Sequence, residues 1–191
     1  MSEFSFALFE TAVGACAIVW SARGIAGVQL PEVDENATRA RVLRRFPKAS
    51  ETAPVPAAQI AIDGIVALLR GERRDLSAIV IDDSAITEFN RRVYAIVRQV
   101  PPGATITYGE VAEQLGDKTL ARAVGQAMGE NPTPIIMPCH RVLAAGGKPG
   151  GFSASGGIVT KLRLLTIEGA QPGGPTLFDD LPLVAPRRRR G

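Results

Sequence analysis

Short apolar runs alternate with turn residues in the first third of the chain. Three runs, at residues 4–9, 15–20 and 25–30, are separated by Gly14 and by Arg23-Gly24. Apolar segments of this length, bounded by glycine, are typical of strands joined by tight turns. A fourth apolar run, at residues 76–81, predicts another strand. The pattern therefore predicts a small sheet near the N-terminus.

Apolar positions at helical spacing follow these runs. They predict helices over residues 37–46 and 57–70, the first charged on one side and the second ending at Gly71. A third helix is expected after Ser84, which would cap it. We place a lobe boundary there, so that residues 1–82 form an α+β lobe and residues 83–170 form a second lobe.

Two short helices joined by a tight turn are expected between residues 107 and 129. Thr107 and Glu110 have the spacing of a capping box, and Gly116 ends the first helix. The second helix, over residues 119–129, places apolar side chains at i, i+3, i+4, i+7 and i+8. These are Leu120, Ala123, Val124, Ala127 and Met128. They predict a buried stripe.

The opposite face of the second helix combines Arg122, Gly125, Gln126 and Gly129. Each glycine costs about 1 kcal/mol relative to alanine inside a helix, and it permits close approach of another surface. The face fits a helix-turn-helix laid against DNA, with Arg122 as its only long cation. It also fits an αα-hairpin whose small residues pack on a neighbouring helix.

Charge and composition narrow the function classes. Hydrophobic residues make up 46% of the 191 residues, which is enough for a substantial core. The net charge of +3 depends on Arg187–Arg190, because without these four arginines 18 basic residues face 19 acidic ones. Nucleic-acid binding must therefore use a local patch. Residues 171–191, rich in Pro and Gly, are expected to be a flexible basic tail, either solvated or adding phosphate contacts.

Cysteine and histidine are scarce. Cys16, Cys139 and His140 are the whole set, too few for a disulfide framework or a Cys/His metal site. We expect no metal and no cofactor. No apolar run approaches the ~20 residues that cross a bilayer, and no basic leader precedes an apolar stretch. A cytoplasmic protein without a membrane partner is expected.

Candidate chemistry gathers at Pro138-Cys139-His140-Arg141. A thiol beside the only imidazole and an arginine is a setting that lowers a thiol pKa and favours the thiolate. The alternative is a buried thiol that acts as a small hydrophobe beside a hydrogen-bonded core histidine. Neighbours in an extended chain point to opposite sides, so a direct Cys–His contact needs a turn or a bridging water.

Glu168 lies in the last turn of the helix predicted over residues 158–168, on one face with Lys161. An acid at that end opposes the helix dipole, at a cost of about 0.3–1 kcal/mol. A cationic or hydrogen-bond-donating partner would offset this cost, and His140 is the natural candidate. A solvated carboxylate is the other interpretation.

Together these residues resemble the O6-alkylguanine-DNA alkyltransferases, also called methylated-DNA–protein-cysteine methyltransferases. The shared motifs are residues 107–112, 121–128, 131–132, 135–142 and 168–169. The resemblance implies an α+β fold: a small N-terminal strand-rich α/β lobe, then a mostly helical C-terminal lobe with a helix-turn-helix and the active-site cysteine.

The resemblance also implies a function. Such a protein repairs DNA by transferring the alkyl group of O6-alkylguanine, and of O4-alkylthymine in some cases, irreversibly to its own cysteine. It acts once per molecule, as a methylated-DNA–[protein]-cysteine S-methyltransferase. By this likeness Cys139 is the acceptor and His140 the base, acting through a water. Glu168 orients His140, Tyr108 protonates the leaving guanine, and Asn131 braces the turn.

The expected partner is double-stranded DNA with alkylated bases, bound through its minor groove by a monomer. Arg122 would take the place of a flipped-out base in the stack. Ala121, Gly125, Gln126 and Arg141 are the further expected DNA contacts.

Substrate contacts are expected from backbone carbonyls near Cys139 and Val142, and from Phe152, Ser153 and Lys161. Phe152 departs from the family pattern, which usually has a tyrosine there, and the segment before Lys161 is about two residues longer. The sequence therefore does not determine the size of the substrate pocket.

Two other classes of protein are compatible with parts of this sequence. A module that binds lesions without reacting would not need Cys139, and a labelled-methyl transfer assay separates it. A cysteine hydrolase would turn over repeatedly and would need an oxyanion hole, for which no segment is recognisable.

Overall fold

The three N-terminal apolar runs form an antiparallel sheet. In the computed structural model, which describes residues 3–170, these strands are β1 (Ser5–Thr11), β2 (Gly14–Ser21) and β3 (Gly24–Gln29). The short β4 (Ser50–Glu51) pairs in parallel with β1, giving the order β3-β2-β1-β4. Each tight turn ends at a glycine with positive φ, Gly14 or Gly24, which is the first residue of the next strand. The three predicted strands are confirmed.

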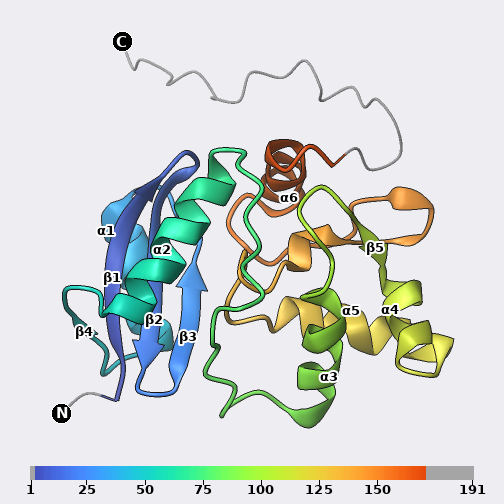
Figure 1. Cartoon of the computed structure of the whole chain (residues 1–191), viewed down its shortest axis with the longest axis horizontal. Coiled ribbons are helices and arrows are strands. Elements are labelled where there is room, and N and C mark those ends of the chain that lie inside the picture. The colour runs from blue at the N-terminus through green and yellow to red at the C-terminus, as the bar shows by residue number, and fades with distance from the viewer. Residues whose placement is uncertain (1–2, 171–191) are drawn as a thin grey trace.

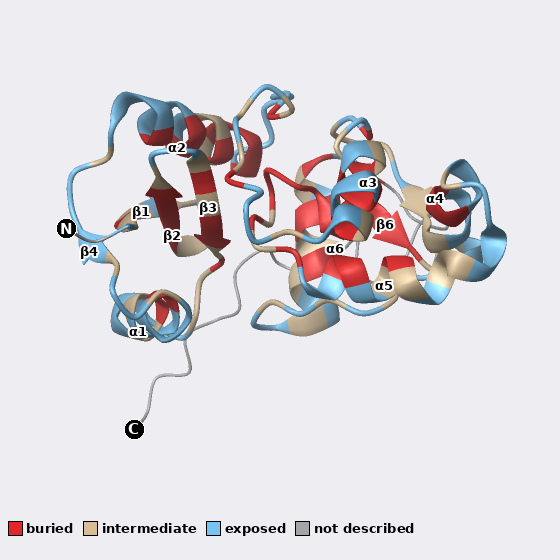
Figure 2. Ribbon diagram, turned by 90° about the horizontal axis from the view of Figure 1, so that it is seen from below, coloured by how far each residue is buried: buried red, intermediate tan, exposed pale blue. Residues whose placement is uncertain are grey.

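Two helices cover opposite faces of this sheet. Helix α1 (Glu35–Arg45) packs through Val42 on one face, and α2 (Pro56–Leu69) packs through Ile65 and Leu68 on the other (Figure 2). Side chains of β2 alternate between the two cores, so Ile18 faces α2 while Val19 faces α1. This explains why β2 reads as a continuous apolar run.

The strand predicted at residues 76–81 is absent. This segment makes a turn and a single bridge between Ile25 and Ile81. Its carbonyl groups are used elsewhere: Arg98 Nη2 donates to the oxygens of Ser77 and Ile79 at 2.5 and 2.7 Å. Because a distant guanidinium takes these acceptors, pairing with β3 is limited to the two backbone hydrogen bonds that Ile25 makes with Val80 and Asp82.

Helices dominate the second lobe, which lies beside the sheet (Figure 1). The α-helices are α3 (Glu88–Val97), α4 (Tyr108–Gln114), α5 (Ala121–Gly129) and α6 (Gly157–Ile167). Single turns of 3₁₀ helix are η1 (Lys118–Leu120), η2 (Cys139–Arg141) and η3 (Ala145–Gly147). Strands β5 (Ile106–Thr107) and β6 (Val142–Leu143) pair in parallel. No helix of residues 3–170 is long and apolar enough to span a membrane.

Local signals set the ends of these helices. The capping box of Thr107 and Glu110 is present at α4. The predicted cap of α3 is wrong: Thr87 accepts the hydrogen bond from Asn90 N–H, while the hydroxyl of Ser84 donates to Asp82. A 3₁₀ turn replaces the first residues of the helix predicted at 119–129. The tail expected at residues 171–191 lies outside the described residues.

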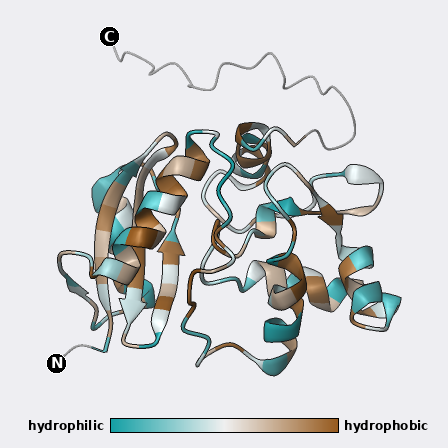
Figure 3. Cartoon of the chain, in the orientation of Figure 1, coloured by the Kyte–Doolittle hydropathy of each residue, from teal (hydrophilic) through white to brown (hydrophobic). Residues whose placement is uncertain are grey.

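The predicted apolar stripe of α5 faces a second core. Val124, Ala127 and Met128 are buried against α3 and α4, whereas Arg122 and Gln126 on the opposite face are exposed. Hydrophobic residues follow the sheet and the inner sides of the helices, and the turn between α4 and α5 is hydrophilic (Figure 3).

Asp82 joins the two lobes. Its buried carboxylate accepts hydrogen bonds from Ser21 and Ser84 hydroxyls at 2.5 and 2.6 Å and from Arg23 Nε at 3.1 Å. Burial alone would raise the pKa of Asp82, but these hydrogen bonds together hold it well below its usual range. The carboxylate therefore stays charged and binds the end of β2 to the segment that leads into α3.

We expect Asp82→Ala to lower the free energy of unfolding by about 2–3 kcal/mol, because it leaves donors of a charge-assisted network unpaired. Urea denaturation at pH 7 measures this change. Asp83→Ala is the matched control, because Asp83 is exposed and lies 3.8 Å from Arg91; it should change stability by no more than about 0.5 kcal/mol. Equal effects of the two substitutions would contradict the role given to Asp82.

Candidate active site

Cys139 begins the single 3₁₀ turn η2 and is 6% exposed. The backbone before it is unusual, since Ile135 has a φ of 75°, a left-handed conformation that β-branched residues rarely adopt. The chain thus turns sharply as it reaches Cys139. Within the described residues the side chains of Cys139 and His140 do not hydrogen-bond to each other, although the 3₁₀ turn keeps both in the interior.

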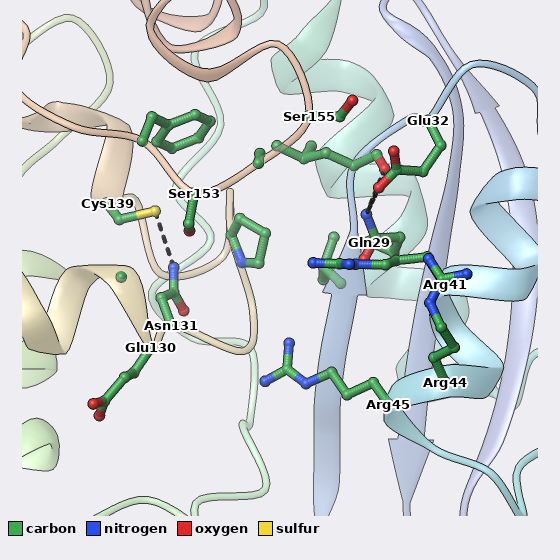
Figure 4. Close-up of a pocket in the computed structure, with 16 residues that line it drawn as sticks. Gln29, Glu32, Arg41, Arg44, Arg45, Glu130, Asn131, Cys139, Ser153 and Ser155 are labelled. Carbon is green, nitrogen blue, oxygen red and sulfur yellow. Dashed lines mark hydrogen bonds between the residues drawn. The ribbon is translucent and has the colours of Figure 1, made fainter.

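Asn131 holds the turn together. Its Nδ2 donates to the sulfur of Cys139 at 3.1 Å and to the carbonyl of Met137 at 2.8 Å. Its Oδ1 accepts from the backbone N–H of Thr133 at 2.9 Å. One amide side chain therefore fixes both the backbone before the cysteine and the direction of the sulfur (Figure 4).

Glu168, the residue that ends α6, is the buried partner of two side chains from η2. Its Oε1 lies 2.9 Å from His140 Nε2, and both of its oxygens accept from Arg141, at 2.7 and 2.8 Å. Burial raises the pKa of Glu168, but the hydrogen bonds from His140 and Arg141 outweigh it and bring the pKa to about 2. The carboxylate is therefore charged, and the solvated alternative is wrong.

His140 is fully buried. Burial lowers its pKa more than Glu168 raises it, so the imidazole is neutral at pH 7. A carboxylate partner at Nε2 assigns the proton to that nitrogen. Nδ1 then carries a lone pair, and it has no hydrogen-bond partner within residues 3–170. His140 thus presents a buried, unused proton acceptor.

Burial also decides the state of the thiol. It raises the pKa of Cys139, against the hydrogen bond from Asn131 and the charge of Lys161, which lower it. The expectation of a lowered thiol pKa is therefore wrong. His140 and Arg141 direct their polar atoms at Glu168, so they leave the sulfur without the cationic neighbours that the sequence suggested.

Lys161 and Tyr108 lie together beyond the sulfur. The Lys161 ammonium donates to the carbonyl of Val142 at 2.5 Å and lies 5.8 Å from the centre of the Tyr108 ring. Burial lowers the pKa of Lys161 to about 8. It raises the pKa of Tyr108, which keeps its proton. Gly150 has a φ of 66°, and a Cβ there would lie 3.1 Å from the Tyr108 ring.

A cavity of about 520 Å³ opens beside Cys139 and reaches the other lobe. Loop residues Phe152 and Ser153 line it next to the sulfur, and Gly129 lines it at the end of α5. The far wall comes from β3, the segment after it, and α1 (Figure 4). The predicted site residues Asn131, Phe152 and Ser153 thus meet Cys139 at one cavity.

Sequence reasoning missed the far wall of this cavity. The part of this wall that comes from α1 consists of Arg41, Arg44 and Arg45. Their i, i+3, i+4 spacing indicates a common helical face, but only the tertiary fold brings that face opposite the cysteine.

Two expected contact residues lie elsewhere. Arg141 was predicted to contact DNA, yet it is 5% exposed and donates to Glu168 and to the carbonyl of Val100 at 2.5 Å. Its guanidinium therefore makes hydrogen bonds inside the protein and does not face solvent. Lys161 is buried, and its ammonium donates to the carbonyl of Val142, the backbone group expected to contact the substrate. Neither Lys161 nor Val142 lines the cavity.

The face of α5 is open. Arg122 and Gln126 are exposed, and Ala121 and Gly125 are half-buried. A Cβ added at Gly129 would meet no atom within 4 Å, and one at Gly125 would only touch the edge of the Tyr108 ring at 4.0 Å. Gly129 therefore packs on no neighbouring helix within the described residues, whereas Gly125 contacts only Tyr108, the first residue of α4. The αα-hairpin explanation does not account for Gly129. No group of three potential metal-ligating side chains occurs in residues 3–170.

Comparisons with known proteins agree with this geometry. Residues 88–170 match the family model "6-O-methylguanine DNA methyltransferase, DNA binding domain". The methylated-DNA–protein-cysteine methyltransferase of Mycobacterium tuberculosis H37Rv is 42% identical over 120 residues, 62% of this chain and 70% of that protein. The protein of that name from Methanothermobacter thermautotrophicus is 36% identical over 142 residues, 74% and 78% of the two chains.

Solved structures extend the likeness to both lobes. The structure of Mycobacterium tuberculosis OGT in complex with DNA matches with a TM-score of 0.69 and 29% identity, over 86% of this chain and 92% of that one. The O6-methylguanine-DNA methyltransferase of Pyrococcus kodakaraensis matches with a TM-score of 0.67 and 26% identity, over 87% and 99%.

We expect acid to destabilise the fold through Glu168. The unfolded carboxyl gains its proton near pH 4.5, whereas the folded one resists protonation to about pH 2. Stability from this group is therefore complete above about pH 5 and is lost as pH falls toward 2. Glu168→Gln should lower the free energy of unfolding at pH 7 by about 3 kcal/mol, because Arg141 stays buried without its ion-pair partner.

Urea denaturation at pH 7, 5, 4 and 3 measures both effects. Between pH 5 and 3, Glu168→Gln should lose less stability than the unmodified protein. The control is Glu113→Gln, because Glu113 is exposed and pairs with Lys118. Its stability should fall with pH as steeply as that of the unmodified protein. Parallel pH profiles for all three proteins would contradict the assignment.

Proposed function

The chain belongs to the methylated-DNA–protein-cysteine methyltransferase family, and we propose that it repairs DNA by moving an alkyl group onto Cys139. The substrate is O6-alkylguanine in DNA, with O4-alkylthymine as a second lesion, and each molecule reacts once. One observation carries this assignment: the sulfur of Cys139 lines a cavity next to an open helical face, with a neutral histidine and a buried carboxylate behind it.

The first step in this proposal removes the thiol proton. Burial raises the pKa of Cys139, so the sulfur enters the reaction protonated. The free Nδ1 of His140 is the base that the site provides, and one water relays the proton because this nitrogen makes no direct hydrogen bond to the sulfur. Glu168 stabilises the imidazolium that forms, as the acid does in other nucleophile–base–acid triads.

The second step is an in-line displacement at the alkyl carbon. A bond from sulfur to carbon forms, the bond from carbon to guanine O6 breaks, and the electron pair leaves with the base. Tyr108 is the proton donor to the leaving guanine, since its raised pKa keeps the phenol protonated at neutral pH. The nearby charge of Lys161 favours the thiolate during attack.

DNA approaches along α5 in this proposal. The exposed face that carries Arg122 and Gln126, with the small residues Ala121 and Gly125, lies in the minor groove. Arg122 enters the stack in place of the flipped nucleotide. Gly129 belongs to both this face and the cavity lining, so the flipped base has a short path to the sulfur. A monomer suffices, because one chain supplies every group.

We expect each molecule to gain the mass of one alkyl group on Cys139 and then to stop. A thioether has no good leaving group, so water does not regenerate the thiol. Incubation with a duplex that contains one O6-methylguanine, followed by intact-mass and peptide measurement, tests this. Cys16 is the internal control: burial raises its pKa to about 12, and it should stay unmodified.

Two variants complete that test. Cys139→Ala should abolish transfer while it still binds the duplex, whereas Cys16→Ala should transfer normally. Repeated turnover, or label on Cys16, would overturn the proposed function. Duplex binding without any mass gain by the unmodified protein would instead indicate a module that only recognises lesions.

We expect Arg122→Ala to slow reaction with the duplex by about tenfold or more relative to its effect on the free O6-alkylguanine base, because only the duplex requires base flipping. The two second-order rates are measured on the same preparation. Arg74→Ala, an exposed arginine of the other lobe, should leave their ratio unchanged. Equal losses on both substrates would assign Arg122 to the chemistry or to folding.

A further inference from the structure

Three arginines of the N-terminal lobe face the cavity that holds the nucleophile. Arg41, Arg44 and Arg45 lie at i, i+3 and i+4 on α1, and their side chains line the wall opposite Cys139 and Asn131 (Figure 4). Three guanidinium groups of α1 thus lie across the cavity from the Cys139 sulfur, although the two walls are far apart in the sequence.

These guanidinium groups have no acidic partner in residues 3–170. The fourth arginine of the helix, Arg39, shows the contrast, since it is bound by Glu35 and Glu51, each at 2.8 Å. Burial lowers the pKa of Arg45, and the charge of Arg41 lowers it further. Like charges are therefore held together without the compensation that the same helix gives to Arg39.

The two carboxylates of the cavity do not neutralise them. Glu32 accepts from Gln29 Nε2 at 3.2 Å, and Glu130 accepts from Asn90 Nδ2 at 2.8 Å. Among the ion pairs of the described residues, those of α1 involve Glu35 and Glu51 and neither of these two carboxylates. Arg44 and Arg45 do lie in the last turn, where cations suit the helix dipole. Arg41 lies outside that turn, so the helix dipole does not explain why all three arginines lie on one face of α1.

Unpaired guanidinium groups that converge on one wall are a binding site for oxyanions, because their planar N–H groups match phosphate oxygens. The cavity begins at Gly129, at the end of the exposed face of α5. A nucleotide that leaves the duplex there brings its own phosphodiester groups with it. These are the anions that the proposed function delivers to this place.

We propose that Arg41, Arg44 and Arg45 bind the phosphodiester backbone of the lesion-bearing strand next to the flipped nucleotide. This inference rests on the proposed function and extends the DNA-binding surface from α5 to α1 of the other lobe. Phosphate contacts position a strand without reading its sequence. The α1 arginines therefore hold the extruded nucleotide against the sulfur, and they contribute to affinity for any DNA sequence.

The test compares two triple variants with the same change in net charge. One replaces Arg41, Arg44 and Arg45 by Gln, which preserves helix propensity. The control replaces Arg70, Arg73 and Arg74 by Gln, three exposed arginines that do not line the cavity. Binding of a labelled duplex with one O6-methylguanine is measured from 50 to 300 mM KCl, with Cys139→Ala added to all proteins so that no transfer occurs.

Each lost phosphate contact lowers the slope of log affinity against log salt by about 0.9. We expect the α1 variant to lose one to three such contacts, and about tenfold or more in affinity at the lowest salt. The control triple variant should keep the slope of the parent. Equal slopes for the two triple variants would overturn the inference and leave only a general effect of net charge.

Transfer rates of the same triple variants, with Cys139 present, separate this inference from the proposed function. The ratio of the duplex rate to the free-base rate should fall at least about fivefold in the α1 variant and stay constant in the control. An unchanged ratio would also overturn the inference. Absence of alkyl transfer in the unmodified protein would overturn the proposed function instead. Thermal melting of each variant checks that folding is intact.

Discussion

The buried carboxylate of Glu168 fixes the part of the chain on which the site depends. It binds His140 and Arg141, two consecutive residues of the turn that begins with Cys139. Burying one negative charge is costly, and a bidentate arginine with an imidazole N–H supplies three hydrogen bonds that offset this cost. The end of α6 is thereby locked to η2. The same contact sets the tautomer of His140 and so directs its free nitrogen away from the acid.

Burial gives the sulfur a particular reactivity. A thiol in this interior stays protonated, because desolvation raises its pKa more than Asn131 and Lys161 lower it. An exposed thiolate would react with many electrophiles, whereas the raised pKa of this sulfur keeps the thiolate scarce at neutral pH. The thioether product is neutral and needs no proton acceptor, so the environment that opposes the thiolate favours the product. The site is suited to a single irreversible transfer.

Local patterns predicted the elements that local physics controls. The alternation of β2, the capping box at Thr107 and the apolar stripe of α5 each depend on neighbours within a few residues. The errors arise where a distant partner decides. Arg98 donates hydrogen bonds to the carbonyls of the segment that was expected to form a fourth strand. Arg141 lies beside the cysteine in the sequence, which suggested a DNA contact, but its hydrogen bonds to Glu168 keep it buried. The arginines of α1 were visible as a charged side, but the cavity opposite them exists only in the folded chain.

The cavity needs both lobes, and hydrogen bonds hold them at a fixed distance. The backbone N–H of Val28 on β3 donates to the carbonyl of Pro132 at 2.9 Å, one residue after the Asn131 that holds the sulfur. Asp82 makes a second connection near the start of β3, where its backbone N–H donates to the carbonyl of Ile25 at 2.9 Å. Backbone and buried polar contacts thus set the spacing between the α1 wall and the Cys139 wall. Phe152 lines this cavity together with Cys139, so its side chain limits the space beside the sulfur.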